Sequence, residues 1–481
     1  MVMSEKMKLD IKKTILIGFG FMSTSIAWNI YDPYITKILQ NVLQSNATIT
    51  AWSNALMQRF PALLEFSKSQ GNDGLSLVPL FIGIIMTFDN IFGVIFQPTF
   101  GKLSDRCRSK YGKRRPFIFF GAPISALLFV LIPLVFLKVG SLPVLMATII
   151  LFVFTMSLWR APVVALMPDL TPSELRSEGN AIINLCGGLG GLIGMISGTI
   201  ITAVFTMIYG KDNFSEFQTY PYVFLIGAAV MVIAVFVLRF FVHEPDSRLK
   251  AVADAREAEA IAKAEKEEKE RLKAMKLSKG ERKSLVFMLA GLFFLFCGSN
   301  AITTFFALFA EEVLHKKTSE ATFLMAVFAV CSMAAAIPAG KIGKKIGRKK
   351  TILIGLCMFA TLSVAYFFRN SSALNWLIWI LLVVGGVANM LITVNTLPLV
   401  LEIGGQEKIG TFTGYYYTAT FSAQIAAPIV FGMFSMFTGT YSTLFVFSPV
   451  AFILSLLCIL FVKHGEAIPD DMIKEAEMSD D

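Results

Sequence analysis

One acidic side chain stands alone in a long apolar stretch of the sequence. Asp89 lies 12 residues before Gly101, or about 18 Å along a helix, in an apolar membrane core about 30 Å thick. No Lys or Arg lies within two helical turns of it in the same run. An ionisable group at that depth is costly and is by default a functional hypothesis. It suits the uptake and release of a proton. The structural alternative is a hydrogen bond to a neighbouring helix or to Asn90.

Two further charged side chains belong to apolar runs. Arg160 comes at the end of the run 142–164. A guanidinium there can donate to the hydroxyl groups of a ligand or hold a carboxylate. A pair with Asp169, or anchoring at the membrane surface, explains it equally well. Asp32 falls nearer the outer surface, and we expect it to cap a helix or line a vestibule.

Amide side chains recur at a similar depth in several of the apolar runs. Together with an aromatic neighbour, they form a candidate substrate-binding set: Trp28, Asn29, Asn90, Gln97, Arg160, Asn300, Asn389 and Gln424. Amides and an aromatic ring can bind a ligand rich in hydroxyl groups. Each amide alone serves equally well as a hydrogen bond between helices.

The composition excludes several classes of protein. Of 481 residues, 55% are hydrophobic and only 16% are charged, whereas a soluble domain carries about 25% charged residues. Such a chain would expose more apolar surface than water tolerates. A soluble enzyme, a disordered chain and a disulfide-stapled secreted domain are therefore excluded. The net charge of +9 lies in short loops between apolar runs, which indicates membrane topology and no nucleic-acid partner.

The residue patterns of enzymes and metal sites do not occur. The six cysteines form no CxxC pair, the three histidines fall near predicted loops, and there is no Ser-His-Asp, zinc or Walker pattern. We therefore expect no catalytic residue, no metal site and no cofactor. The polar, basic N-terminus runs into an apolar stretch without a small-residue cleavage site, so we expect no signal peptide.

Twelve apolar runs are long enough to cross a bilayer, since a helix needs about 20 residues to do so. They cover residues 14–36, 75–100, 117–138, 142–164, 179–208, 220–242, 285–310, 320–340, 351–368, 374–398, 409–435 and 441–463. With the N-terminus in the cytoplasm, 35 of the 43 Lys and Arg residues fall in inner segments and 8 in outer loops. The positive-inside rule then predicts a multi-pass protein of the plasma or inner cell membrane, with both termini cytoplasmic.

The fifth run is unusually rich in glycine. Its spacings Gly187/Gly191, Gly190/Gly194 and Gly194/Gly198 put small residues on one helix face. Such a face lets a neighbouring helix approach closely. No strand precedes the run, so a nucleotide-binding glycine loop is excluded.

A charged segment divides the runs into two sets of six. Residues 243–284 contain pairs such as Glu259–Lys263, which are spaced to stabilise a helix. We interpret the segment as a cytosolic helix that joins an N-terminal bundle (1–242) to a C-terminal bundle (285–464). A regulatory docking segment is the alternative. Residues 465–481 form an acidic cytosolic tail that we expect to be disordered.

The two sets repeat each other in their inner loops. The loop after the second run contains a glycine, an aspartate and basic clusters: Gly101, Asp105, Arg106, Gly112, Arg114 and Arg115. The loop after the eighth run repeats the pattern from Gly340, 239 residues later, with Lys344 in place of the aspartate. Asp169 and Glu402, after the fourth and tenth runs, match at a separation of 233. Two six-span halves with matching inner loops are typical of parallel-repeat transporters.

These motifs resemble those of a known family. A glycine, an aspartate and a basic cluster in this loop are similar to the signature of the major facilitator superfamily. The strings Gln97-Pro98-x-x-Gly101-x-x-Ser104-Asp105-Arg106 and Gly112-Lys-Arg-Arg-Pro-Phe-Ile resemble the glycoside–pentoside–hexuronide:cation symporters. With Ala165-Leu-Met-Pro-Asp169-Leu-Thr-Pro, the closest branch is that of the sucrose-type proton symporters (solute carrier family 45-like). The resemblance covers both halves and is strong in the first.

The resemblance implies an all-α membrane protein. Its twelve transmembrane helices would form two pseudo-symmetric six-helix bundles, the major facilitator fold. It also implies an inner gate built from the loop residues above together with Asp169 and Glu402. In that gate, Asp105 would cap a helix N-terminus and pair with an arginine. Lys344 departs from the pattern, so we expect the second latch to be weak or absent.

The coupling ion follows from a further departure. The sodium-using, melibiose-like members carry acids one and two turns beyond Asp89, where this chain has Gly93 and Gln97. Their extra acid in the first span is missing here, and they have a sugar-contacting acid at the position of Arg160. A sodium site needs several oxygen ligands, so a single acid favours a proton over sodium.

We therefore expect a secondary active transporter that is monomeric in the lipid bilayer. It would couple uptake of a sucrose- or other glycoside-like sugar to protons by alternating access, with Asp89 as the proton-coupling residue. Sodium-coupled sugar symport, proton-coupled export of a drug-like or amphipathic compound, and a non-transporting sensor or scaffold are the alternatives.

Overall fold

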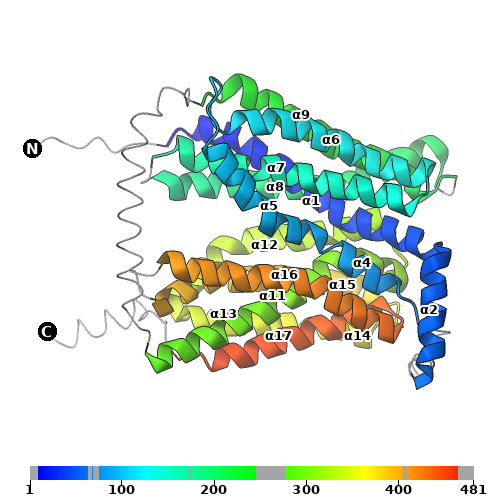
Figure 1. Ribbon diagram of the computed structural model, residues 1–481. Helices are drawn as coiled ribbons and strands as arrows, with labels where there is room; N and C mark the ends of the chain where they lie inside the picture. The colour runs from blue at the N-terminus through cyan, green and yellow to red at the C-terminus, as the bar shows by residue number, and fades with distance from the viewer. Residues whose placement is uncertain are drawn as a thin grey trace, which may run out of the picture. The chain divides into compact units, whose positions relative to one another are not determined.

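The computed structural model describes residues 9–62, 65, 68, 75–172, 175–211, 213–244, 278–404 and 409–463. In these ranges, twelve helices are long and apolar enough to cross a membrane, and Figure 1 shows them as long ribbons. Each one overlaps a run predicted from the sequence, so the predicted all-α fold with twelve spans is confirmed. The charged pairs of the linker and the tail 465–481 lie outside the described residues.

The chain divides into two compact units. Unit 1 comprises Met1–Ser45, Phe88–Glu259 and Thr318–Phe323, and unit 2 comprises Asn46–Thr87, Ala260–Lys317 and Leu324–Asp481. The chain therefore enters the second unit between its first and second spans and then returns. The division into bundles 1–242 and 285–464 follows from the internal repeat and stays a prediction.

Unit 1 is built around its first helix. Its helices are α1 (Ile11–Gln44), α5 (Phe88–Asp105), α6 (Arg115–Lys138), α7 (Leu142–Leu170), α8 (Arg176–Tyr209) and α9 (Tyr220–Phe241), with the short η2 (Glu216–Thr219). Helix α1 packs against α8 and α9, α6 packs between α7 and α9, and α5 packs against α7. Buried aromatic rings such as Phe129, Phe152 and Phe224 fill the centre.

Unit 2 holds the remaining helices. They are α2 (Ala47–Arg59), α4 (Val78–Ile85), α11 (Lys279–Leu314), most of α12 (Thr318–Ile346), α13 (Arg348–Ala360), η3 (Thr361–Ser363), α14 (Val364–Phe367), α15 (Leu374–Gly404), α16 (Ile409–Thr438), η5 (Tyr441–Thr443) and α17 (Leu444–Leu460). Helix α11 packs against α16 and α17, and α13 packs against α15. A capping box of Ser278 and Glu281 fixes where α11 begins, because it satisfies two backbone donors that the helix leaves free.

The first turn of α12 belongs to unit 1, and hydrogen bonds hold it there. The Glu216 carboxylate accepts the backbone N–H of Thr318 at 2.6 Å. The Tyr220 hydroxyl lies 3.1 Å from the Thr318 hydroxyl, and the Thr199 hydroxyl donates to the Ser319 carbonyl at 3.0 Å. Since α12 continues into unit 2, this single helix spans both units.

Two of the twelve spans, the second and the fourth, depart from the predicted runs. The second span is two helices, α4 and α5, separated at Met86 and Thr87, and the Thr87 hydroxyl donates to the carbonyls of Gly83 and Ile425. Asp89 therefore lies in the first turn of α5, where the helix dipole favours a negative charge. Helix α7 continues through Pro162 to Leu170, so the prediction that Arg160 ends the fourth span is wrong. Proline removes one helix hydrogen bond without ending this helix.

The glycine face of α8 brings α1 into backbone contact. A methyl group added at Gly190 would collide with the Met22 carbonyl oxygen, and one at Gly194 would lie 2.9 Å from that of Ile26. The prediction of a closely approaching neighbour helix is confirmed, and that neighbour is α1. In unit 2, Gly83 and Gly432 serve α4 and α16 in the same way.

Candidate functional site

The end of unit 1 that the charge pattern predicts to be cytoplasmic holds a cluster of paired charges around Arg114. The Arg114 side chain is buried, and its Nε donates to Asp169 at 2.8 Å. Its other nitrogens donate to the Asp105 carboxylate, to the Ser104 hydroxyl and, at 3.2 Å, to the Gly101 carbonyl. This one guanidinium thus joins the ends of α5 and α7 at the start of α6.

An acid that the sequence did not single out completes this cluster. The Glu244 carboxylate accepts the backbone N–H groups of Lys113 (2.9 Å), Arg114 (2.9 Å) and Arg115 (3.2 Å). It therefore caps the N-terminus of α6, where a negative charge is favoured. Gly112, with φ of +94°, allows the tight turn, because a side chain there would collide with Glu244.

Two more side chains of this loop, Lys113 and Cys107, interact with the acids of the cluster. The Lys113 amino group lies 3.2 Å from Asp169 and 3.9 Å from Asp105, so its charge does more than orient the chain. Burial, followed by the nearby Glu244 carboxylate, raises the pKa of the Cys107 thiol. Arg106 is exposed and makes no ion pair with the described residues.

The corresponding end of unit 2 is also held by charge, but by different residues. Arg348, at the start of α13, forms an ion pair with Glu402 of α15. The Lys349 amino group donates to the carbonyls of Leu460 (3.1 Å) and Val462 (2.6 Å) after α17. Lys344 makes no ion pair in the described part of the chain. A charged contact thus exists where the departure at Lys344 led us to expect a weak latch or none.

A second cluster in unit 1 lies within the membrane-spanning helices. The Arg160 guanidinium of α7 interacts electrostatically with two carboxylates, Asp89 of α5 and Asp32 of α1. The two carboxylates also interact with each other. Arg160 lies over the Trp28 ring, with 5.6 Å between the guanidinium carbon and the ring centroid. Asp169, the alternative partner predicted for Arg160, is instead held by Arg114 and Lys113.

Polar atoms beside this cluster lack partners. The indole N–H of Trp28 and the hydroxyl of Tyr31 are buried and form no hydrogen bond to the described residues. Their rings meet edge to face at 5.3 Å, and Tyr31 stacks on Phe152 at 5.6 Å. An unpaired buried donor costs about 1–3 kcal/mol. A ligand or water that supplied an acceptor here would remove that cost.

Two of the other predicted binding residues of unit 1, Asn90 and Asn29, have local partners. Asn90 donates its amide N–H to the Asp89 carboxylate at 3.0 Å, which was the structural alternative for this pair. Asn29 donates to the Ser25 carbonyl at 2.8 Å, and its amide packs on Gly191 of α8. Gln97 lies two turns beyond Asp89 on α5 and is partly buried.

The predicted amides of the second half lie in unit 2. Asn300 of α11 donates to the Phe296 carbonyl at 2.8 Å, and Gln424 of α16 is partly buried. Asn389 of α15 lines a mostly apolar cavity of about 160 Å³ together with Ser299 and Thr303. All three amides thus lie in unit 2, and none of them forms a hydrogen bond to another helix among the described residues.

The sequence did not predict the partners of Asp32, and it gave no sign of the role of Glu244. Asp32 was expected to cap a helix or line a vestibule near the outer surface, but it lies inside α1 and so caps no helix, and it interacts electrostatically with Asp89 and Arg160. Its only sequence signal was an ionisable residue in an apolar run. Glu244 follows the sixth span directly, and nothing in its spacing indicated that it would cap a helix 130 residues earlier.

Comparison with known proteins places the chain in a family. The profile described as Major Facilitator Superfamily matches residues 14–428 and 288–477. The computed structure is similar to that of a D-xylose-proton symporter, with a TM-score of 0.62 at 16% identity, covering 95% of this chain and 98% of that one. It is equally similar to a bacterial homologue of the iron transporter ferroportin, with a TM-score of 0.62 at 13% identity, covering 95% and 100%. At these identities the likeness shows the fold alone.

Curated relatives match over shorter segments. Mouse "Solute carrier family 45 member 4" is 30% identical over 119 residues, or 22% of this chain and 15% of that protein. "Sucrose transport protein SUC3" of Arabidopsis thaliana is 28% identical over 142 residues (26% and 24%). "Multidrug resistance protein 2" of Bacillus subtilis (strain 168) is 25% identical over 197 residues (41% and 48%). Each match spans less than half of the relative's length.

The family profile covers most of the chain, and the twelve apolar helices have the fold of solved transporters. The chain therefore belongs to the Major Facilitator Superfamily and is a multi-pass membrane transporter, not an enzyme.

Proposed function

We propose that the protein is a proton-coupled sugar symporter that works by alternating access. The observation that carries the proposal is the Arg160 guanidinium inside the membrane-spanning part of unit 1, which lies over the Trp28 ring and interacts electrostatically with Asp32 and Asp89. The proposed location is the cell membrane, with both termini in the cytoplasm and a monomer as the working unit.

The charge balance of this cluster supports proton coupling. Two ionised carboxylates beside one guanidinium leave a net charge of −1 in a medium where unpaired charge is costly. One bound proton removes that charge. The empty cluster is then charged and the loaded cluster neutral, and this difference is what links proton binding to movement across the membrane. Asp89 is the proposed proton carrier. Asp32 is the second acid, which gives the cluster one more negative than positive charge.

The groups around the cluster support a sugar as substrate. The unpaired N–H of Trp28 and O–H of Tyr31 can bind hydroxyl groups, and the carboxylates can accept hydrogen bonds from them. The Trp28 ring offers an apolar face for the C–H groups of a sugar ring. A sucrose transport protein and a solute carrier family 45 member among the relatives favour the sucrose-type branch of the glycoside–pentoside–hexuronide:cation symporters.

Uptake into proteoliposomes tests the proposal directly. Purified protein is reconstituted, a pH gradient is imposed, and uptake from a panel of labelled sugars is measured. We expect at least one glycoside to accumulate against its gradient in a proton-dependent manner. Asp89→Asn should abolish accumulation while keeping exchange of sugar for sugar, because the variant is always neutral. Glu178→Gln, an exposed acid in the first turn of α8, is the matched control and should behave as the unaltered protein does.

Two other outcomes would reject parts of the proposal. Accumulation by Asp89→Asn would show that this residue does not couple. Accumulation driven by a sodium gradient without a pH gradient would replace the proton.

Export of a drug-like or amphipathic compound is the second candidate, and similarity to a multidrug resistance protein favours it. The direction of transport in sealed vesicles separates the two functions, because an exporter moves its substrate against the flow of protons.

A further inference from the structure

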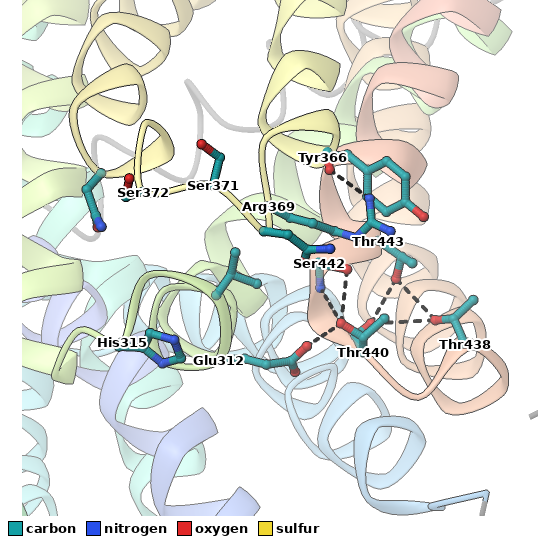
Figure 2. Close-up of a pocket in the computed structure, with 13 residues that line it drawn as sticks. Glu312, His315, Tyr366, Arg369, Ser371, Ser372, Thr438, Thr440, Ser442 and Thr443 are labelled. Atoms are coloured by element: carbon teal, nitrogen blue, oxygen red, sulfur yellow. Dashed lines mark hydrogen bonds between the residues drawn. The ribbon is translucent and has the colours of Figure 1, made fainter. Parts of the chain in front are cut away.

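A large polar cavity lies at one end of unit 2, apart from the residues considered so far. It has a volume of about 730 Å³, within the range of about 300–1,000 Å³ that is typical of small-molecule sites. The end of α11, the turn between α14 and α15, and the loop between α16 and η5 form it (Figure 2). Twelve of its thirteen lining side chains are polar or charged. The charge pattern predicts that this end faces away from the cytoplasm.

One wall of the cavity is fixed by hydrogen bonds. Both oxygens of the Glu312 carboxylate accept the backbone N–H of Tyr441, at 3.1 and 3.0 Å, and the Thr440 hydroxyl donates to it as well. Thr440 in turn lies 3.0 Å from the Ser442 hydroxyl, and Thr438 lies 3.2 Å from the Thr443 hydroxyl. Figure 2 shows these hydroxyl groups and the Glu312 carboxylate, with dashed lines for the hydrogen bonds between them. The wall's acid is thus already occupied by donors of the protein itself.

Two nitrogen-containing side chains of the cavity, Arg369 and His315, have N–H groups or ring nitrogens that form no hydrogen bond with the described residues. Arg369 stacks on the Tyr366 ring at 4.2 Å and donates Nη1 to the Tyr366 carbonyl at 3.0 Å. Its remaining N–H groups form no ion pair with the described residues. His315 ends α11 in the left-handed conformation, with φ of 54°, and its imidazole makes no hydrogen bond within the described part of the chain. Asn375 and Ser372 add further donors to the lining.

The excess of donors defines the chemistry of a ligand. A stacked guanidinium with free N–H groups matches two oxygens of a carboxylate or phosphate, and an imidazole can supply another donor. Among the described residues, Glu312 is the one carboxylate of the lining, and the protein's own donors already bind it. We propose that this cavity is a binding site for a small organic anion, held through a carboxylate or phosphate group by Arg369 with His315 as the second donor.

Binding of defined probes to the purified full-length protein tests the site. Isothermal titration calorimetry would use glucuronate as the carboxylate, inorganic phosphate as the phosphate, and glucose as the neutral counterpart of glucuronate. We expect saturable binding of at least one of the two anions and none of glucose at the same concentrations. Which anion binds distinguishes a carboxylate from a phosphate ligand.

Variants locate the binding. Arg369→Gln should weaken anion binding about tenfold or more, as expected when a charge-assisted hydrogen bond is lost. Arg369→Lys keeps the charge but lacks the planar pair of N–H donors. Its affinity for the anion should lie between those of the unaltered protein and Arg369→Gln. Arg59→Gln, an exposed arginine at the end of α2, removes the same charge outside the cavity and should leave binding unchanged.

Three results would overturn the proposal. They are no saturable binding of either anion, binding of glucose as tight as that of glucuronate, or undiminished anion binding by Arg369→Gln. A thermal unfolding curve for each variant shows that it is folded. The site is independent of the sugar proposal, since Arg160 and Asp89 are intact in all these variants.

Discussion

At the scale of single residues, charged side chains do their work in this protein through partners on other helices. Arg160 interacts electrostatically with acids of two other helices, and Arg114 forms hydrogen bonds to acids of two helices. Glu244 is the simplest case, because its carboxylate accepts three backbone N–H groups at the start of α6.

Glu244→Ala should therefore destabilise the protein. The loss should be about 1–2 kcal/mol, which is typical for the removal of a helix cap. It should also speed modification of Cys107 by maleimide, because the carboxylate contributes to the raised pKa of the thiol and a lower pKa gives more thiolate at neutral pH. Thermal unfolding and labelling rates measure the two effects. Glu65→Ala, an exposed acid, should change neither. An unchanged labelling rate in Glu244→Ala would contradict this view of the loop.

The sequence predicted which residues are unusual better than it predicted their partners. Asp89 and Arg160 stand out because charge is rare in apolar runs, and burial depth can be estimated along a helix. The electrostatic partners of Asp32 and the capping role of Glu244 were not predicted, because these partners depend on how the helices rotate and pack. A single sequence indicates how deep in the membrane a residue lies, but not which neighbouring helix its side chain points toward.

At the scale of helices, the length of each apolar run determined which spans could be predicted from the sequence. All twelve spans were predictable because each needs about 20 apolar residues. The ends of the spans were harder to predict, because α1 and α11 continue beyond their apolar runs as amphipathic or polar turns. The break between α4 and α5 had no strong signal, and the Thr87 hydroxyl at the break donates to the carbonyl of Ile425, far along the chain.

The contact between α1 and α8 gives a prediction at this scale. Gly190→Ala should destabilise unit 1 by about 1–3 kcal/mol, because the added methyl group meets the Met22 backbone, which cannot move aside cheaply. Gly414→Ala on α16 is the control, since nothing lies within 4 Å of the added methyl group there and alanine favours a helix. Thermal unfolding in detergent compares the two. Equal stability of the two variants would refute the close packing of α1 on α8.

At the scale of the whole molecule, the family assignment was predictable and the substrate was not. The loop strings around Gly101 and Gly112 point to the superfamily, and the profile match confirms it. The substrate depends on a few side chains of each unit, and those are amides and aromatics that also occur as ordinary contacts between helices. The sequence therefore predicts the fold and the superfamily, but it does not determine which substrate is carried.

Energetics of the whole cycle give a further prediction. If one charge crosses with each sugar, a potential of about 100 mV supplies about 2.3 kcal/mol, enough for about 50-fold accumulation. Proteoliposomes with an imposed potassium diffusion potential, at equal pH on both sides, measure this ratio. An accumulation ratio that does not respond to the potential would show that the loaded and empty forms differ by no charge.

Proton movement during sugar uptake is the most direct measurement. Lightly buffered proteoliposomes receive a transported sugar at zero pH gradient, and the external pH is recorded beside the uptake of labelled sugar. The charge balance at Asp32, Asp89 and Arg160 predicts that the medium becomes alkaline, with one proton taken up for each sugar, and that Asp89→Asn gives no pH change. Sugar uptake by the unaltered protein without any proton uptake would contradict the account.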